Sequence, residues 1–69
     1  MAKFVIYRDI AGQYRWRLVA NNGEKVAASE AYVSRQGALN SAQRVKILAV
    51  SATIVNNTTS ELVRRLLNR

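Results

Sequence analysis

Residues 14–20, with the sequence YRWRLVA, alternate large apolar side chains with arginines, and a glycine-containing connection flanks them on each side. Successive side chains of a β-strand point to opposite faces of the sheet. The pattern therefore predicts a strand with one buried face, in which Trp16 points inward while Arg15 and Arg17 point outward. The rest of the chain has to supply an apolar cover for the indole.

Two more strands are predicted beside this one. Residues 3–8 (KFVIYR) are rich in β-branched and aromatic side chains, which suit a half-buried pleated surface. Asn22-Gly23 is a strong hairpin signal because both residues tolerate the positive φ of a type I′ turn. Residues 24–30 then return as a third, weaker strand. The inner face of this sheet would hold Phe4, Ile6, Trp16 and Leu18.

After the predicted strands, the hydrophobic period changes to that of a helix. Ser34 is the predicted N-cap, since its hydroxyl can accept a hydrogen bond from a free amide of the first turn. Ile47 falls nearly opposite the apolar side of this helix, which makes it a candidate contact for a second subunit or for the C-terminal segment. The apolar stripe itself consists of Ala38, Leu39, Ala42, Val45 and Ala49.

The C-terminal part predicts one more strand and one more helix. Residues 51–55 (SATIV) have the composition of a short fourth strand. Residues 58–61 (TTSE) match the capping box that begins a helix, and the leucines that follow must dock on something because so short a helix is marginal alone. The order β-β-β-α-β-α predicts an α+β fold, with a domain over 1–56 and an amphipathic extension over 57–69.

The length of the chain points to a second subunit. A domain of 69 residues buries a small fraction of its surface, so its core is marginal. The sequence has no Cys and no His, which excludes disulfides and the usual zinc ligands. Association with another copy is the remaining way to complete the core, and we expect a homodimer.

The charge balance allows two interpretations. Eleven Lys and Arg residues against four Asp and Glu residues give a net charge of +7, which attracts polyanions such as nucleic acid. In the simpler interpretation the charge serves solubility, Arg15 pairs with Glu30 and Tyr7 packs against an arginine stem. The candidate nucleic-acid contacts are Lys3, Tyr7, Arg15, Arg17, Arg64 and Arg65.

Catalysis is not expected from these residues. Neutral-pH acid–base and nucleophilic chemistry usually relies on His or Cys, and the four acidic residues are scattered along the chain. No glycine-rich phosphate loop is present, so we expect no cofactor and no small-molecule substrate. Lys3 and Arg8 interrupt the N-terminal apolar run, and no run of about 18 apolar residues occurs, so we expect a cytoplasmic protein outside the membrane.

Four short motifs carry a resemblance to a known family. They are GQYRWRL (12–18), ANNGE (20–24), ASE-x-Y (28–32) and SR-x-x-ALN (34–40). Over residues 3–50 the chain resembles the YegP-like family of small domains, whose function is not established. The family usually has glycine where this chain has Ala31, and Asn-Gly where it has Asn40-Ser41; serine should favour the helix there.

The resemblance implies a β3-α-β unit. In that family two such units, in tandem or in two subunits, join in a single sheet and exchange their C-terminal strands. This chain has one copy, so the resemblance implies a homodimer and brings no catalytic residues. We therefore expect a small, basic, non-enzymatic homodimeric module; the alternative is a nucleic-acid-binding protein that uses the basic outer sheet face. The predicted interface residues are Ile47, Thr53, Ile54 and Val55.

Overall fold

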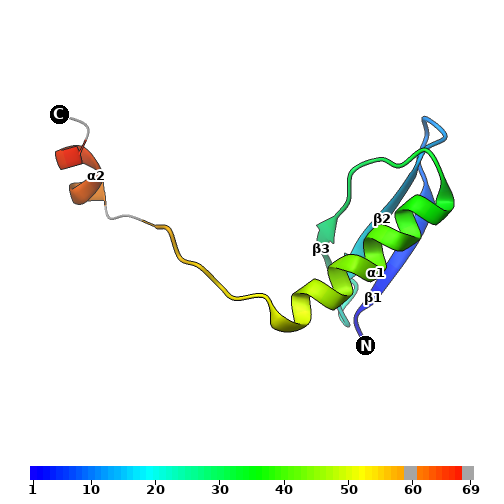
Figure 1. Ribbon diagram of the computed structural model, residues 1–69, viewed down its shortest axis with the longest axis horizontal. Helices are drawn as coiled ribbons and strands as arrows, with labels where there is room; N and C mark the ends of the chain where they lie inside the picture. The colour runs from blue at the N-terminus through cyan, green and yellow to red at the C-terminus, as the bar shows by residue number, and fades with distance from the viewer. Residues whose placement is uncertain (59–60, 68–69) are drawn as a thin grey trace.

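The computed structural model describes the backbone of residues 1–58 and 61–67, and the side chains of 1–58 and 64–67. The strands form one antiparallel sheet in the order β1-β2-β3, and α1 lies across one of its faces (Figure 1). The predicted α+β fold, with an antiparallel sheet packed on one helix, is confirmed. The elements are β1 (Lys3–Arg8), β2 (Tyr14–Val19), β3 (Lys25–Ala28), α1 (Arg35–Ser51) and α2 (Glu61–Leu67).

The two hairpins are closed by the same kind of loop. In each, a glycine with positive φ, Gly12 at 83° or Gly23 at 86°, follows a turn. The N–H of Gly12 donates to the carbonyl of Asp9 at 3.0 Å, and that of Gly23 to the carbonyl of Ala20 at 2.9 Å. This is the three-residue hairpin loop that ends in a left-handed glycine. The predicted type I′ turn is wrong, because Asn22 does not have a positive φ.

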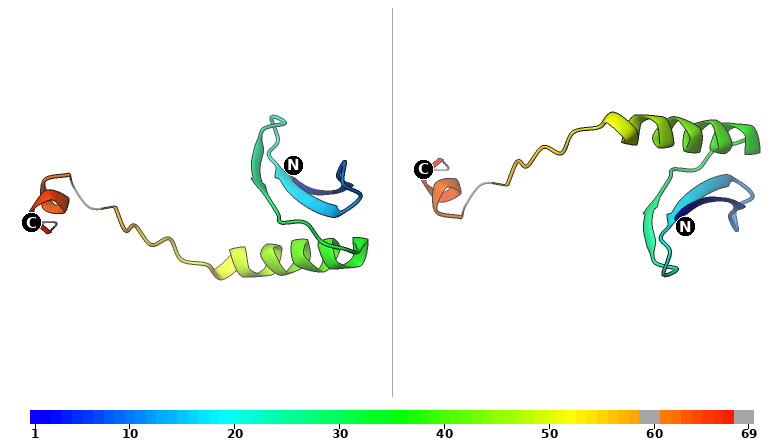
Figure 2. Two further views of the ribbon diagram at one scale, coloured as in Figure 1. Left: turned by 90° about the horizontal axis from the view of Figure 1, so that it is seen from above. Right: turned by 90° about the horizontal axis from the view of Figure 1, so that it is seen from below.

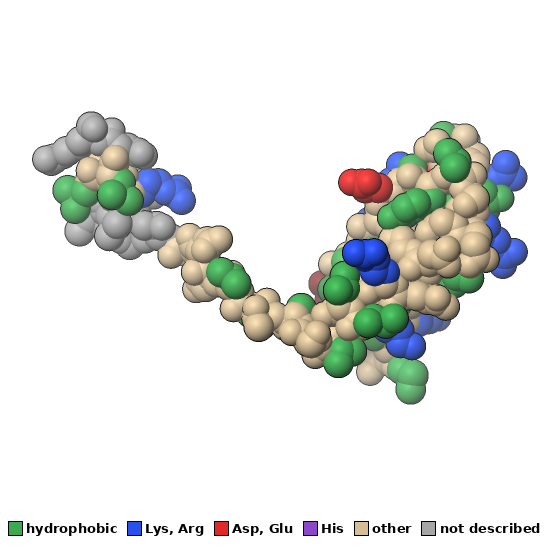
Figure 3. All heavy atoms as spheres, in the orientation of Figure 1, with side chains coloured by type: hydrophobic (Ala, Val, Ile, Leu, Met, Phe, Trp, Pro, Cys, Tyr) green, Lys and Arg blue, Asp and Glu red, His purple; other side chains and the backbone are tan. Residues whose placement is uncertain are grey.

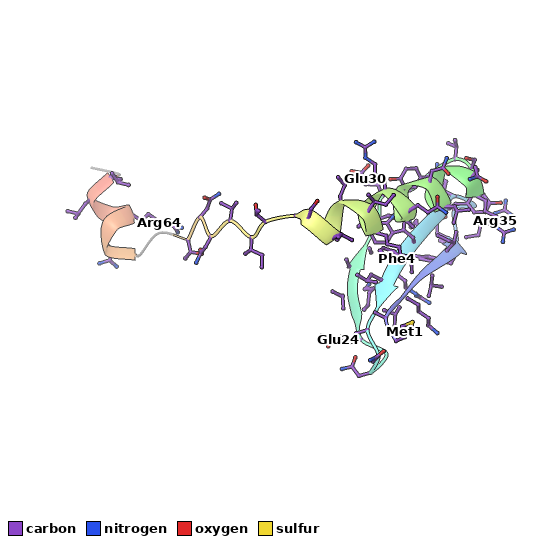
Figure 4. All side chains as sticks on the ribbon, turned by 60° about the horizontal axis from the view of Figure 1, so that its bottom comes forward. Met1, Phe4, Glu24, Glu30, Arg35 and Arg64 are labelled. Atoms are coloured by element: carbon purple, nitrogen blue, oxygen red, sulfur yellow. The ribbon has the colours of Figure 1, made fainter. Side chains whose placement is uncertain are left out.

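The strand register places the tryptophan on the inner face. Ile6 pairs with Trp16 and Phe4 with Leu18 between β1 and β2, as predicted. The Trp16 side chain is 6% exposed, and the Phe4 ring meets the indole edge-on, with ring centroids 5.2 Å apart. Figure 4 shows Phe4 between the sheet and α1. The indole is therefore the centre of the core.

Helix α1 covers the indole with small residues. Ala38 and Ala42, one turn apart, are buried and allow the helix to approach the sheet closely. Between them on this side of the helix, the Ser41 hydroxyl oxygen accepts two hydrogen bonds. Trp16 Nε1 donates at 3.0 Å and the Tyr32 hydroxyl at 2.7 Å. The polar edge of the indole is thus satisfied inside the core, as buried polar groups require.

The two ends of α1 differ. At its start the Ser34 hydroxyl oxygen accepts a hydrogen bond from the N–H of Gly37 at 3.0 Å, so the predicted N-cap is confirmed. The predicted apolar stripe is covered only in part: Leu39 near the start of the helix and Ala49 near its end are exposed, and Val45 is half-buried. The helix packs on β1 and β2 and makes no comparable contact with β3. Figure 2 shows the tip of the β2–β3 hairpin standing away from α1.

The fourth strand expected over residues 51–55 is absent from the single chain. Ser51 still belongs to α1, and residues 52–58 have no regular structure. Ala52 is extended, with φ −66° and ψ 136°, but a strand needs hydrogen-bonding partners that this chain does not offer the segment. The segment leads away from the sheet to α2 (Figure 1). The predicted capping box falls partly on residues 59–60, outside the described residues.

The described helices are too short or too polar to cross a membrane.

Replacing the indole tests this core. We expect Trp16→Ala to lower the free energy of unfolding by about 3–5 kcal/mol, because it removes the central side chain and leaves a cavity. Val33→Ala changes an exposed side chain and should shift stability by about 0.5 kcal/mol or less. Chemical denaturation followed by circular dichroism measures both. Wild-type stability in Trp16→Ala would show that the faces of the sheet are assigned wrongly.

Candidate functional site

The sheet face opposite α1 carries basic side chains from all three strands. Val5 pairs with Arg17 and Tyr7 with Arg15 across β1 and β2, and all four lie on this outer face. The candidate nucleic-acid contacts predicted on the sheet therefore share one surface. They differ in whether another side chain of the protein already pairs with them.

Arg15 is neutralised by an acidic residue at the first hairpin. Its Nε donates to Asp9 Oδ2 at 2.8 Å, and Asp9 Oδ1 accepts from the N–H of Gln13 at 2.9 Å. The predicted pairing of Arg15 with Glu30 is wrong, because β3 ends at Ala28 and Glu30 is exposed in the loop beyond it. Arg15 thus holds the hairpin turn in place and adds little positive charge to the outer face.

This ion pair changes the titration of both partners. The hydrogen bond from Arg15 is the main cause that lowers the pKa of Asp9 below its usual value of 3.8, and the Gln13 N–H adds to the effect. The same hydrogen bond raises the pKa of Arg15. Both groups are charged at neutral pH.

Tyr7 lies against an arginine, as the simpler interpretation of the sequence expected. The Arg17 guanidinium carbon is 5.0 Å from the centroid of the Tyr7 ring, within the range of a cation–π contact. The guanidinium covers one face of the ring, where a nucleic-acid base would otherwise stack. Tyr7 therefore supports Arg17 and offers little aromatic surface of its own.

A bulge in the second hairpin brings a further cation to the outer face. Arg17 pairs with Ala28 and Leu18 with Ala27, but the register then shifts and Val19 pairs with Lys25. A regular register would place Val26 opposite Val19 and turn Lys25 to the inner face. Bulges redirect side chains in this way.

The result is a group of three cations at one end of the outer face, which we call the basic cluster: Lys3, Arg17 and Lys25. Lys3 and Lys25 flank Val19 from the two neighbouring strands. The three side chains line a shallow depression of about 510 Å³, together with Val5, Val19 and Gly23. Lys25 could not be predicted as part of this surface, because nothing in the sequence near it signals the bulge.

The other two candidate cations lie elsewhere. Arg64 and Arg65 belong to α2, and Figure 4 shows Arg64 far from the sheet. The basic residues predicted to contact nucleic acid are thus divided among the basic cluster, the Asp9 ion pair and α2.

The predicted interface residues are open in the single chain. Ile47 on α1 is 70% exposed, and Ile54 in the segment after α1 is 98% exposed. Thr53 and Val55 are exposed beside it. Figure 3 shows further apolar side chains around the C-terminal end of α1, where Leu48 and Val50 are also exposed.

A groove follows the flank of α1 that faces the β3 side. It has a volume of about 700 Å³, and its lining includes Tyr32, Ser41, Arg44, Ile47 and Leu48. The helix thus has one flank on the sheet and another flank open.

Within the described part of the chain, no three His, Cys, Asp or Glu side chains are grouped closely enough to hold a metal ion.

Comparison with known sequences places the chain in a family. Residues 9–56 match the model of a domain of unknown function, DUF1508. The chain belongs to this family. Among its relatives, a UPF0339 protein of Methanosarcina acetivorans is 44% identical over 55 residues, which cover 80% of this chain and 95% of that protein. A UPF0339 protein of Agrobacterium fabrum is 41% identical over 59 residues, covering 86% of this chain and 95% of the relative.

Solved structures of similar proteins agree with the fold. A solution NMR structure of a Haloferax volcanii protein is similar with a TM-score of 0.72 at 39% identity, covering 80% of this chain and 93% of that one. A solution NMR structure of an Agrobacterium tumefaciens protein has a TM-score of 0.68 at 39% identity, covering 81% and 90%. The family resemblance drawn from the motifs is confirmed, and the family's function is unknown.

The Asp9–Arg15 pair yields a prediction in acid. The pKa of Asp9 should lie below 3.8 in the wild type and rise in Arg15→Gln, which removes the main hydrogen bond; carbon-detected NMR titration measures it. Because the folded pKa is lowered, the pair stabilises the fold above about pH 4 and loses this effect as pH falls through the lowered pKa. A wild-type pKa unchanged by Arg15→Gln would contradict the pairing.

Proposed function

We propose that the protein is a non-catalytic homodimeric module, in which residues 52–55 of one copy add a strand to the open edge of β3 in the other. The observation that carries this proposal is that one helix covers only two of the three strands. A surface left open in this way invites a second copy, since a small domain gains most from the apolar area that association buries.

The inner side of β3 is the part left open. Ala27 pairs with Leu18 and so lies on the inner face, yet it is exposed because α1 does not reach it. β3 is also an edge strand, whose free N–H and C=O groups are a template for another strand.

The open flank of α1 supports the same partner. The groove lined by Ile47 and Leu48 also includes Tyr32, which follows β3 along the chain, and a segment added beyond β3 would pack on these apolar side chains. Thr53, Ile54 and Val55 are β-branched, which suits a strand, and none of them contacts its own chain's core. A second copy of this segment fits both the edge and the groove.

Symmetry makes the exchange reciprocal. If each copy donates residues 52–55 to the other, both open edges are covered at once in a closed two-fold assembly. The sheet edge is then protected from further association, and the chain supplies no His or Cys for catalysis at the surfaces that remain.

The assembly can be tested by sedimentation equilibrium at micromolar concentrations. We expect a dimer of twice the 7.7 kDa chain mass. Ile54→Asp/Val55→Asp should give a folded monomer. Neighbouring residues of a strand face opposite sides of the sheet, so this variant places a negative charge on both faces of the added strand and opposes its pairing with β3.

The matched control is Ile10→Asp/Val33→Asp, which replaces the same two residue types at exposed loop positions and should stay dimeric. Circular dichroism checks that both variants keep the fold. A wild type that is monomeric throughout this range, or a dimer that survives the Ile54→Asp/Val55→Asp change, would contradict the proposal.

A further inference from the structure

We propose that the basic cluster, Lys3, Arg17 and Lys25, is a binding site for one phosphate group. The site lies on the outer face of the sheet, and its residues come from β1, β2 and β3 of one chain. All three cations of the site therefore come from one chain, whereas the proposed strand exchange concerns the free edge of β3.

The bulge assembles the cluster. Lys3 and Lys25 pair with the same residue, Val19, from opposite sides. Neighbouring strands lie about 4.8 Å apart, so the backbones of the two lysines are about 10 Å apart. Lysine side chains are long enough for both ammonium groups to contact one small anion held between them. Arg17 lies two residues from Val19 on the same face and completes a triangle. With a regular register Lys25 would face the other way and only two cations would remain.

The positive charge of the cluster is not compensated. No ion pair within 4.0 Å joins any of the three cations to a carboxylate among the described residues, although Glu24 is next to Lys25 in sequence. Arg15, the fourth cation of this face, contrasts with them because Asp9 neutralises it. Holding three like charges in one depression is unfavourable, and a bound anion relieves that repulsion.

The position of Arg17 suits a phosphate in particular. Its guanidinium rests on the Tyr7 ring, which limits its motion, and its planar set of donors matches phosphate oxygens. Lys3 and Lys25 add mobile point charges. A phosphate ester carries about −1.5 to −2 charges at pH 7. It therefore balances the three positive charges of the cluster better than a carboxylate, which carries a single negative charge.

The charge is also localised. The valines of the depression give it an apolar floor, which strengthens electrostatic attraction compared with open water. Away from this end of the face, Arg15 is neutralised by Asp9, and the Tyr7 ring is covered by the Arg17 guanidinium. A nucleic-acid strand lying along the face would find neither a row of free cations nor an aromatic platform. The geometry thus fits one phosphate group, free or at the end of a larger molecule.

Nitrogen–proton NMR titrations at about 150 mM salt test the proposal with three probes: inorganic phosphate, a ten-nucleotide oligo-dT with a 5′-phosphate, and the same oligo-dT without it. We expect phosphate to shift the amide signals of residues 3, 17, 19, 23 and 25. A 5′-phosphate that binds more tightly than free phosphate indicates a nucleic-acid end as its source; equal binding indicates a small phosphorylated ligand.

The test variant is Lys3→Gln/Lys25→Gln, which keeps the Tyr7–Arg17 contact and should weaken phosphate binding about tenfold or more. Arg35→Gln/Lys46→Gln removes the same charge from exposed positions of α1 and should bind as the wild type does. Shifts spread over all the cations, equal binding by the oligo-dT without a 5′-phosphate, or unchanged affinity in Lys3→Gln/Lys25→Gln would each overturn the proposal.

Discussion

The fold depends on the burial of one indole. Trp16 is the only tryptophan and the only large side chain that is buried among the described residues. Its ring meets Phe4 on the sheet and lies under the small residues Ala38 and Ala42 of α1, while Ser41 accepts its N–H. Ser41 thus joins the sheet, the helix and the Tyr32 loop.

The same arrangement limits how much the single chain can cover. A helix centred on Trp16 reaches β1 and β2 but leaves β3 and its own C-terminal half open. Ile47, Leu48 and Val50 are exposed in the C-terminal half of α1. Figure 3 shows apolar side chains gathered around this end of the helix. The bulge in the pairing of β2 with β3 turns Lys25 toward Lys3 and Arg17 on the outer face.

Most of the fold could be predicted from the sequence because its signals are local. Alternation around Trp16 indicated the two faces, glycines marked both hairpins, and Ser34 marked the start of α1. One local prediction failed, the type I′ turn at Asn22-Gly23, because the loop has three residues and only its glycine has a positive φ. The other predictions that failed depend on loop geometry, strand register or a neighbouring strand. Asp9 rather than Glu30 pairs with Arg15 because the loop geometry decides which carboxylate is near. Residues 51–55 form no strand alone because a strand exists only with a neighbour. Lys25 escaped notice because a one-residue register shift reverses the face of a side chain.

We propose that one chain buries the indole but needs a second copy to close its sheet. Isotope-filtered NOE spectra of a sample mixed from labelled and unlabelled protein test this most directly, because they report contacts between copies only. The account predicts intermolecular NOEs from the Ile54 and Val55 methyl groups to Ala27 of β3 and to Ile47 of α1. Contacts of Ile54 and Val55 with these residues within one copy only, or none at all, would contradict it.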